Sequence, residues 1–121
     1  MPSKQRLHDF IATVEAGEYI RAIEEFYDDD ASMQENAAAP RKSRAALVAH
    51  ERMMLKHVES IKTRPPQRIA VDGDLVVINW IFDITTRDGN TRVLDELAIQ
   101  RWHNDKIVEE QFYYDASPPR T

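Results

Sequence analysis

Two histidines in one predicted helix have the chemistry for proton transfer. His50 and His57 lie seven residues apart, on the side of a helical repeat that also carries Leu47 and Met54. Histidine titrates near neutral pH, so either residue could donate or accept a proton during an isomerisation or a cyclisation. The alternative for each is structural, because a helix histidine is commonly a satisfied residue of the core or its rim.

Three charged residues interrupt the predicted apolar face of a sheet. Asp95, Arg101 and Glu110 lie among alternating apolar residues, where a charge is costly unless it is paired, solvated at a pocket mouth or used in chemistry. The expected register makes Arg101 and Glu110 diagonal neighbours. They could therefore form an ion pair at the mouth of a cavity or bind a substrate, and Asp95 could accept a hydrogen bond from Tyr114.

The first half of the chain predicts three helices that would cover this sheet. Apolar spacing predicts a helix over 3–16, which ends before a glycine, and a second helix over 18–27. A short strand is expected at 31–35. A third helix is predicted from Ser43, a good N-cap, to about Ile61, before two prolines.

The second half predicts an antiparallel meander. After the prolines the apolar residues recur with a twofold period, and turn signals divide this part of the chain into strands at 67–71, 75–86, 91–103 and 106–114. Helices followed by such a meander indicate an α+β fold with the helices gathered on one face of the sheet.

Tight turns fix the expected register of the meander. If Asp88-Gly89 is a two-residue hairpin loop, Trp80 lies opposite Leu97, and the same rule at the following Asn-Asp turn places Ile99 opposite Glu110. Strand residues alternate between the two faces of a sheet. The face under the helices would then consist of Val76, Ile78, Trp80, Phe82, Ile84, Val93, Leu97, Ile99, Val108, Phe112 and Tyr114.

The opposite face of the sheet is too apolar in places for a surface that meets only water. Such a face predicts a homodimer that forms through the sheet. The residues expected on it are Ile81, Ala98, Gln100, Trp102, Ile107, Gln111 and Tyr113.

Composition limits the classes of partner. The 121 residues include 16 basic and 21 acidic side chains, for a net charge of -5, and no cysteine. This balance argues against nucleic acid, and a chain without cysteine has no thiolate metal site. No run reaches the roughly 20 apolar residues of a membrane span, and no glycine-rich phosphate loop exists. We therefore expect one cytoplasmic domain over 1–116, a flexible tail over 117–121, and neither a metal nor a cofactor.

Several segments carry a resemblance to a known family. With the layout of two helices, a short strand, a third helix and a long meander, residues 7–115 resemble the NTF2-like superfamily, in particular its SnoaL-like and ketosteroid-isomerase branch. The resemblance implies a cone-shaped barrel in which three N-terminal helices pack on a curved antiparallel sheet around a cavity. The segments that carry it are 15–18, 26–33, 40–47, 101–108 and 112–115.

The resemblance also implies a position for a catalytic carboxylate. The isomerases of this branch use a carboxylate at the end of the first strand to move a proton beside a carbonyl, and Glu35 stands at that place. Their two oxyanion donors have no counterpart, because the tyrosine position falls on Phe10 and the aspartate position on Ala98 or Ile99. Steroid isomerisation by that mechanism is therefore not expected. The arginine and aspartates of the related limonene epoxide hydrolases are also missing at the matching positions.

Two functions follow from these residues. The first is a cofactor-independent isomerase, cyclase or lyase that transfers a proton on a small, mostly apolar, carbonyl-bearing molecule, with Glu35, His50 and His57 as catalytic candidates. The alternative is a noncatalytic dimeric protein of the same fold that binds a ligand or another protein. The residues expected to contact the small molecule are Phe10, Met54, Trp80, Phe82, Asp95, Leu97, Ile99, Arg101, Glu110, Phe112 and Tyr114.

Overall fold

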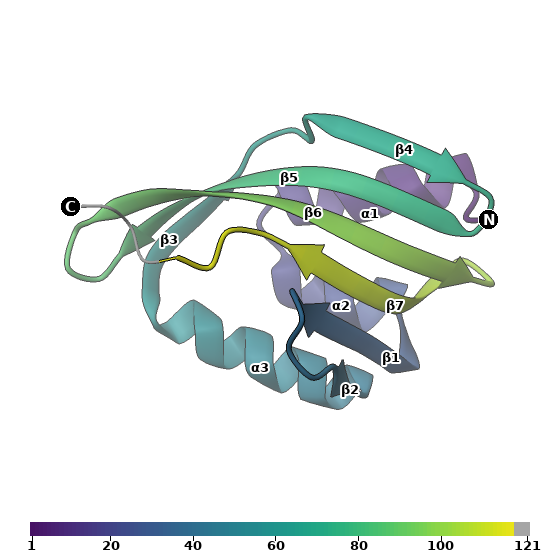
Figure 1. Cartoon of the computed structure of the whole chain (residues 1–121), viewed down its shortest axis with the longest axis horizontal. Helices are drawn as coiled ribbons and strands as arrows, with labels where there is room; N and C mark the ends of the chain where they lie inside the picture. The colour runs from purple at the N-terminus through teal and green to yellow at the C-terminus, as the bar shows by residue number, and fades with distance from the viewer. Residues whose placement is uncertain (118–121) are drawn as a thin grey trace.

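The computed structural model describes residues 1–117, which form three helices and seven strands (Figure 1). Residues 118–121, which belong to the tail predicted to be flexible, lie outside the described residues. In chain order the elements are α1 (Lys4–Glu15), α2 (Tyr19–Phe26), β1 (Tyr27–Glu35), β2 (Arg41–Lys42), α3 (Arg44–Lys56), β3 (Val58–Thr63), β4 (Arg68–Asp72), β5 (Leu75–Thr86), β6 (Thr91–His103) and β7 (Lys106–Tyr113).

Serine caps explain where α1 and α3 begin. The Ser3 hydroxyl accepts a hydrogen bond from the backbone N–H of Arg6 at 3.0 Å, and the Ser43 hydroxyl accepts one from Ala46 at 3.2 Å. Each bond satisfies an amide that has no partner inside the first helical turn. The first two helices lie within the segments predicted for them, and α3 begins directly after the predicted cap.

The prediction for the end of α3 is wrong. The helix was expected to continue to about Ile61, but it stops at Lys56, and His57 is its C-cap residue. The next residues form β3, in which Val58 pairs with Thr86 and Ile61 with Ile84 of β5. The segment after His57 is rich in β-branched residues, which suit a strand, and pairing with β5 outweighs the helical periodicity.

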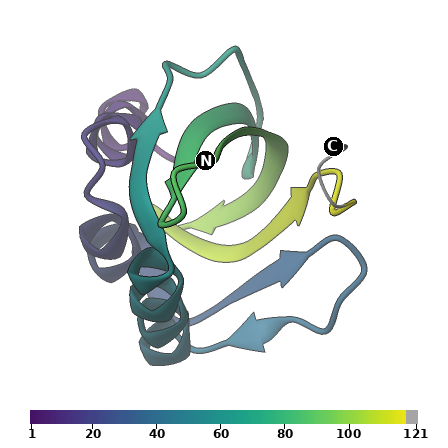
Figure 2. The same cartoon turned by 90° about the vertical axis from the view of Figure 1, so that its left-hand side faces the viewer.

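The sheet is mixed rather than antiparallel, which corrects the predicted arrangement. Its strand order is β2-β1-β7-β6-β5-β3, with β4 also paired to β5, and β1 runs parallel to β7. The sheet curls into an open barrel, and the three helices lie on one side of it (Figure 2). This is the expected α+β architecture of three helices on a curved sheet, an NTF2-like cone. The concave face of the sheet can therefore surround a cavity.

The β5–β6 register differs from the prediction by one residue. The loop between the strands has three residues, not two, since the Thr86 N–H donates to the carbonyl of Asn90 at 2.8 Å and Gly89 takes a positive φ of 87°. Trp80 therefore pairs with Glu96 rather than with Leu97. A shift of one residue moves every β6 side chain to the other face. Leu97, Ile99 and Arg101 thus lie on the outer face, while Glu96, Ala98, Gln100 and Trp102 face inward.

The β6–β7 turn has the predicted length, but a bulge behind it changes the pairing. Asn104 and Asp105 take positive φ angles of 50° and 59°, as a two-residue hairpin turn requires. An irregularity between Arg101 and Trp102 then shifts the register. As a result Gln100, and not Ile99, lies opposite Glu110.

Aromatic residues fill the end of the barrel next to α1, which we call the closed end. Trp102 is 1% exposed, and its ring packs edge-on against Phe10, with 5.8 Å between the ring centroids. Phe10 also packs against Phe26 at 5.4 Å. Buried aromatic rings in this geometry contribute strongly to a core. Trp102 was expected on the outer face, and the corrected register explains its burial.

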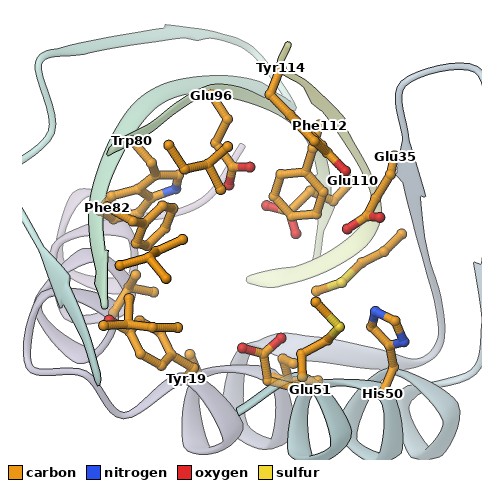
Figure 3. Close-up of a pocket in the computed structure, with 18 of the residues that line it drawn as sticks. Tyr19, Glu35, His50, Glu51, Trp80, Phe82, Glu96, Glu110, Phe112 and Tyr114 are labelled. Atoms are coloured by element: carbon orange, nitrogen blue, oxygen red, sulfur yellow. The ribbon is translucent and has the colours of Figure 1, made fainter. Parts of the chain in front are cut away.

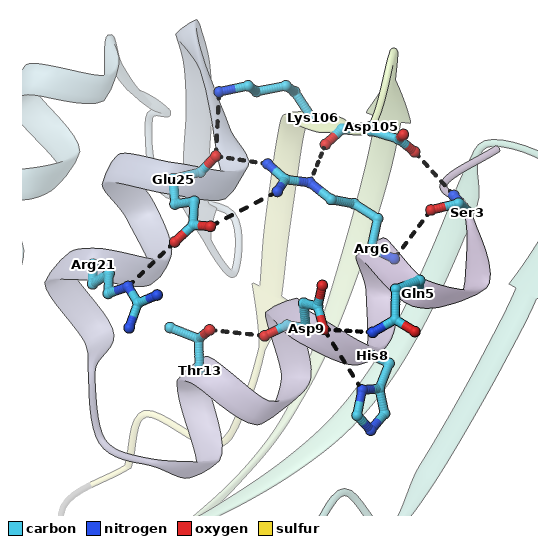
Figure 4. A network of polar contacts seen from close by, with 10 residues as sticks. All are labelled: Ser3, Gln5, Arg6, His8, Asp9, Thr13, Arg21, Glu25, Asp105 and Lys106. Atoms are coloured by element: carbon cyan, nitrogen blue, oxygen red, sulfur yellow. Dashed lines mark hydrogen bonds and ion pairs between the residues drawn. The ribbon is translucent and has the colours of Figure 1, made fainter.

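Polar contacts fasten the β6–β7 turn to the helices at the closed end (Figure 4). The Arg6 guanidinium donates to the backbone carbonyl of Asp105 at 3.0 Å and to that of Glu25 at 2.8 Å. The backbone N–H of Ser3 donates to the Asp105 carboxylate at 2.9 Å, and Lys106 donates to the Glu25 carbonyl at 3.2 Å. These contacts hold α1, α2 and the β6–β7 hairpin together at the closed end.

Candidate functional site

A cavity of about 270 Å³ lies between the concave face of the sheet and helices α2 and α3 (Figure 3). Its wall is mostly apolar and carries a few ionisable groups, as is usual for small-molecule sites. The catalytic candidates Glu35 and His50 line it. The predicted ligand contacts that line it are Phe10, Met54, Trp80, Phe82, Glu110, Phe112 and Tyr114.

The structure places the other candidates elsewhere. His57 is exposed at the C-terminal end of α3 because the helix stops before it. Asp95 faces outward and accepts a hydrogen bond from the Asn79 amide at 2.7 Å, rather than from Tyr114. Arg101 is exposed and pairs with Glu109 at 2.7 Å, rather than with Glu110.

Leu97 and Ile99 also lie outside the cavity. Both occupy the outer face of β6 because the β5–β6 loop has one residue more than predicted. The same shift brings Glu96, which was not predicted to face the cavity, into its lining. The signal that could have found Glu96 is the Thr-Arg-Asp-Gly-Asn sequence of the loop, which suits a three-residue turn with glycine in the left-handed position.

Three rings, those of Tyr19, Trp80 and Phe82, form one side of the cavity, which we call the aromatic wall. The Phe82 ring lies 6.1 Å from that of Trp80 and 6.2 Å from that of Tyr19, measured between centroids. The Tyr19 hydroxyl is 2.6 Å from the Thr63 hydroxyl of β3. This contact joins α2 to β3, and β3 pairs with β5, which carries the other two rings. The two interactions hold the aromatic wall against the helices; the β3–β5 pairing was not predicted from the sequence.

Glu110 is held at the inner end of the cavity by two donors. Its side chain is 3% exposed; the Tyr27 hydroxyl donates to one carboxylate oxygen, and the Gln100 amide donates to the other at 2.6 Å. The Trp102 indole N–H in turn donates to the Gln100 carbonyl oxygen at 2.9 Å, which orients the amide. Burial raises the pKa of the Glu110 carboxyl to about 7, although both hydrogen bonds favour its ionised form.

Glu96 occupies a different environment on the neighbouring strand. It is 9% exposed, and its carboxyl points into the cavity (Figure 3). Burial, reinforced by the nearby carboxylates of Glu110, Glu35 and Glu51, raises the pKa of Glu96 to about 8. No donor or cation among the described residues opposes this shift. At neutral pH Glu96 is therefore mainly a neutral carboxylic acid.

Helix α3 contributes a second unforeseen acid, Glu51. It stands at the i+4 position of the stripe that begins at Leu47, so the periodicity that selected His50 and Met54 also points to it. Burial raises the pKa of the Glu51 carboxyl, and the charge of Glu35 acts in the same direction. Burial lowers the pKa of His50, which is therefore mainly neutral at pH 7.

The carboxyl groups of Glu96 and Glu110 form the chemically distinctive part of the site. They project from adjacent strands into one apolar cavity, and only Glu110 has fixed hydrogen-bond partners. One group is suited to give a proton and the other to take one at neutral pH. Tyr27 and Gln100, which hold Glu110, were both missed: Tyr27 was assigned to the second helix, and Gln100 to the outer face.

Within residues 1–117 no group of three or more histidine or acidic side chains could hold a metal ion. The helices of this part of the chain are all too short or too polar to cross a membrane.

Comparisons with known proteins agree on the fold. A model of the SnoaL-like domain matches residues 7–110. A SnoaL-like protein from Mesorhizobium loti, provisionally named a polyketide cyclase or carbohydrate phosphatase, is 25% identical, with 94% of this chain and 100% of that chain covered and a TM-score of 0.78. The comparison with curated proteins gives no match.

Two further solved structures carry small molecules. TerC, co-crystallised with polyporic acid, is 14% identical, with 92% of this chain and 89% of that chain covered and a TM-score of 0.78. A protein of ketosteroid isomerase-like fold from Catenulispora acidiphila, in complex with trimethylamine, is 15% identical, with 95% and 88% covered and a TM-score of 0.79. At this identity the likeness concerns the fold alone.

Proposed function

Because the chain belongs to the SnoaL-like domain family, we propose that it is a cofactor-independent isomerase, cyclase or lyase acting on a small, mostly apolar molecule with a carbonyl group. The observation that carries the proposal is the pair Glu96 and Glu110, two carboxyls with different surroundings in one apolar cavity. Structures of the same fold that hold polyporic acid or trimethylamine support a role in binding small molecules.

The proposed chemistry is an enolisation by proton transfer. Glu96, neutral near pH 7, donates its proton to the carbonyl oxygen, while the carboxylate of Glu110 removes a proton from the adjacent carbon. The electrons of the broken C–H bond form a C=C bond, and those of the C=O π bond stay on the oxygen, which becomes a hydroxyl. Return of a proton to a different carbon gives an isomer, and attack by the enol carbon on a second carbonyl gives a ring.

Glu35 and His50 are the other candidates for the base. Glu35 lines the cavity at the end of β1, in the place that the isomerases of this family use, and His50 faces the cavity from α3. Glu110 is preferred because Tyr27 and Gln100 fix its carboxylate, and a base is effective when its orientation is fixed before the substrate arrives.

Deuterium exchange tests this proposal. The protein is incubated in D2O with a panel of small cyclic and open-chain ketones, and NMR measures exchange at the carbon beside the carbonyl. Glu110→Gln and Glu96→Gln should each lower the rate by about 100-fold or more. Glu109→Gln is the matched control, since Glu109 is the exposed neighbour of Glu110 on β7. Rates that stay unchanged in both cavity variants would refute the proposal, and a loss in Glu35→Gln alone would move the base to Glu35.

The noncatalytic alternative is favoured by one observation. Phe10 stands where the isomerases have a hydroxyl donor, and its ring, which lines the cavity and packs against Phe26 and Trp102, has no group that could donate a hydrogen bond to a ligand oxygen. A protein of this kind would bind the same ketones, as measured by thermal shift, without exchanging their protons.

A further inference from the structure

The cavity combines acidic groups with aromatic rings. Carboxyls reach it from four elements: Glu35 from β1, Glu51 from α3, Glu96 from β6 and Glu110 from β7. The aromatic wall borders the same space (Figure 3). A negatively charged group would be repelled by this wall, whereas a positive charge would be attracted by the carboxylates and by the faces of the rings.

Glu96 is the acid without a partner. It is buried to more than nine-tenths and points into the cavity. The influences on its carboxyl are burial and three other carboxylates, with neither a hydrogen-bond donor nor a cation among the described residues. Every fully enclosed side-chain oxygen or nitrogen of the described residues has a hydrogen-bond partner, so the carboxyl oxygens of Glu96, which have none, are open to the cavity and within reach of a ligand there.

Trp80 and Glu96 are directly opposite each other in the β5–β6 ladder and lie on the same concave face. The Cβ atoms of such a pair are about 5 Å apart. An indole ring and a carboxyl therefore border one volume, as required for a group that contacts a ring face and an acid together.

The basic groups that line the cavity act at other places. Arg41 lowers the pKa of His50 and opposes the rise at Glu51, and Arg92 opposes the rise at Tyr114. Neither guanidinium acts on Glu96. The space beside Trp80 and Glu96 therefore lacks a compensating cation within the described part of the chain.

We propose that this space binds a small organic cation, an alkylammonium group, which lies between the Glu96 carboxylate and the aromatic wall. The inference rests on the proposed function only in taking this cavity as the binding site; because a bound cation ionises Glu96, the cation is a ligand that occupies the cavity in place of the carbonyl substrate and is not itself that substrate. Coulomb attraction to Glu96 and cation–π contact with Trp80 would act together on a cation in this cavity.

Binding of a cation should release a proton. The cation favours the ionised form of Glu96, whose pKa in the free protein is about 8, so affinity should rise with pH from about 7 to 9. Ionisation of Glu110, with a pKa of about 7, adds to the release at the lower end of this range. The pKa values of Tyr19, Tyr27 and Tyr114 are raised, so these hydroxyls stay neutral. The other ionisable groups that face the cavity are Glu35, Glu51, His50, Arg41 and Arg92.

Calorimetry with a pair of isosteres tests the proposal on the full chain. Choline and 3,3-dimethylbutan-1-ol have the same shape but differ in carrying a cationic nitrogen or a neutral carbon. Choline should bind about tenfold more tightly than the alcohol, and more tightly at pH 9 than at pH 7. Titrations in phosphate and in Tris, whose ionisation enthalpies differ, should show proton release for choline only. Glu96→Gln should remove the preference for the cation, and Glu109→Gln should keep it.

Three results would overturn the inference: equal or tighter binding of the alcohol by the unaltered protein, no detectable choline binding at millimolar concentration, or an unchanged preference in Glu96→Gln. The comparison of the two probes needs no variant, so it holds even if Glu96→Gln does not fold. Choline binding without ketone exchange would leave this inference standing and remove the proposed function. Exchange that depends on Glu96 and Glu110, without choline binding, would do the reverse.

Discussion

The two ends of the barrel use the inward face of the same strand in opposite ways. At the closed end, Gln100 and Trp102 of β6 are buried, and their polar atoms bond to each other and to Glu110. Two residues before Ala98, Glu96 is nearly as well buried, but its carboxyl faces an empty volume. The closed end therefore resembles a satisfied core, whereas the Glu96 carboxyl has no hydrogen-bond partner among the described residues and is open to the cavity, where a ligand can reach it.

The largest effect should come from removing the ring that fills the closed end. Trp102→Ala removes the contact with Phe10 and the hydrogen bond to Gln100, and should lower the free energy of unfolding by about 4 kcal/mol. Phe82→Ala, at a half-buried ring of the aromatic wall, should cost about 1–2 kcal/mol, because part of its ring already faces a cavity. Urea denaturation measures both. Equal losses would mean that the two ends are packed alike.

Protonation of Glu96 should make stability depend on pH. Its pKa is about 8 in the folded protein and about 4.5 in the unfolded chain, so between these values the folded protein binds one more proton. Stability should therefore fall as pH rises through this window and level off above it. Glu96→Gln lacks the titration and should exceed the unaltered protein in unfolding free energy by about 5 kcal/mol at pH 9.

Thermal denaturation from pH 4 to pH 9 measures this difference, with Glu109→Gln as the control that keeps the dependence. A Glu96→Gln variant that is less stable than the unaltered protein at pH 9 would contradict the raised pKa of Glu96. A stabilising substitution that abolishes activity is the usual sign of a residue retained for function.

The structure of the two ends could be predicted from the sequence only in part, because it depends on loop length and on pairing between distant strands. Local signals correctly placed α1, α2 and the start of α3, because Ser3, Ser43 and the apolar spacing act within a few residues. The two-residue turn at Asn104-Asp105 was also predicted correctly. These features involve neighbours in the chain, so single-sequence reasoning reaches them.

The errors arose where distant segments decide the outcome. The loop before Asn90 is one residue longer than predicted, so the predicted register exchanged the two faces of β6. Glu96 was therefore not predicted at the cavity, and Leu97 was wrongly placed there. The end of α3 depends on the pairing of Val58 and Ile61 with β5, which the periodicity of the sequence does not indicate. The resemblance to a family placed Glu35 at the cavity correctly, because it supplies the topology that local patterns lack.

A smaller effect should follow from loosening the hold on Glu110. Gln100→Leu removes one of its two donors and leaves the Trp102 N–H without an acceptor, for a loss of about 2 kcal/mol in stability. Since that hydrogen bond favours the carboxylate, the pKa of Glu110 should rise. The acid limb of the pH profile for ketone exchange should move to higher pH. Tyr27→Phe should shift it in the same direction, and a limb that moves in neither variant would remove Glu110 as the titrating base.

The smallest effect on folding should come from the outer side of β6. Leu97 is 41% exposed between the inward-facing Glu96 and Ala98, and Tyr113, its partner on β7, is 44% exposed. Leu97→Lys should change the free energy of unfolding of the monomer by no more than about 0.5 kcal/mol, because its side chain belongs to neither end. The homodimer was predicted through a face of which Ala98, Gln100, Trp102 and Ile107 are in fact buried inside the protein. If the outer face with Leu97 and Tyr113 forms that dimer instead, light scattering should show a dimer for the unaltered protein and a monomer for Leu97→Lys. Met53→Lys, on the exposed side of α3, is the control that should stay dimeric. A monomer in all three proteins would refute the dimer and leave the contrast between the two ends intact, because that contrast depends only on side chains inside one chain.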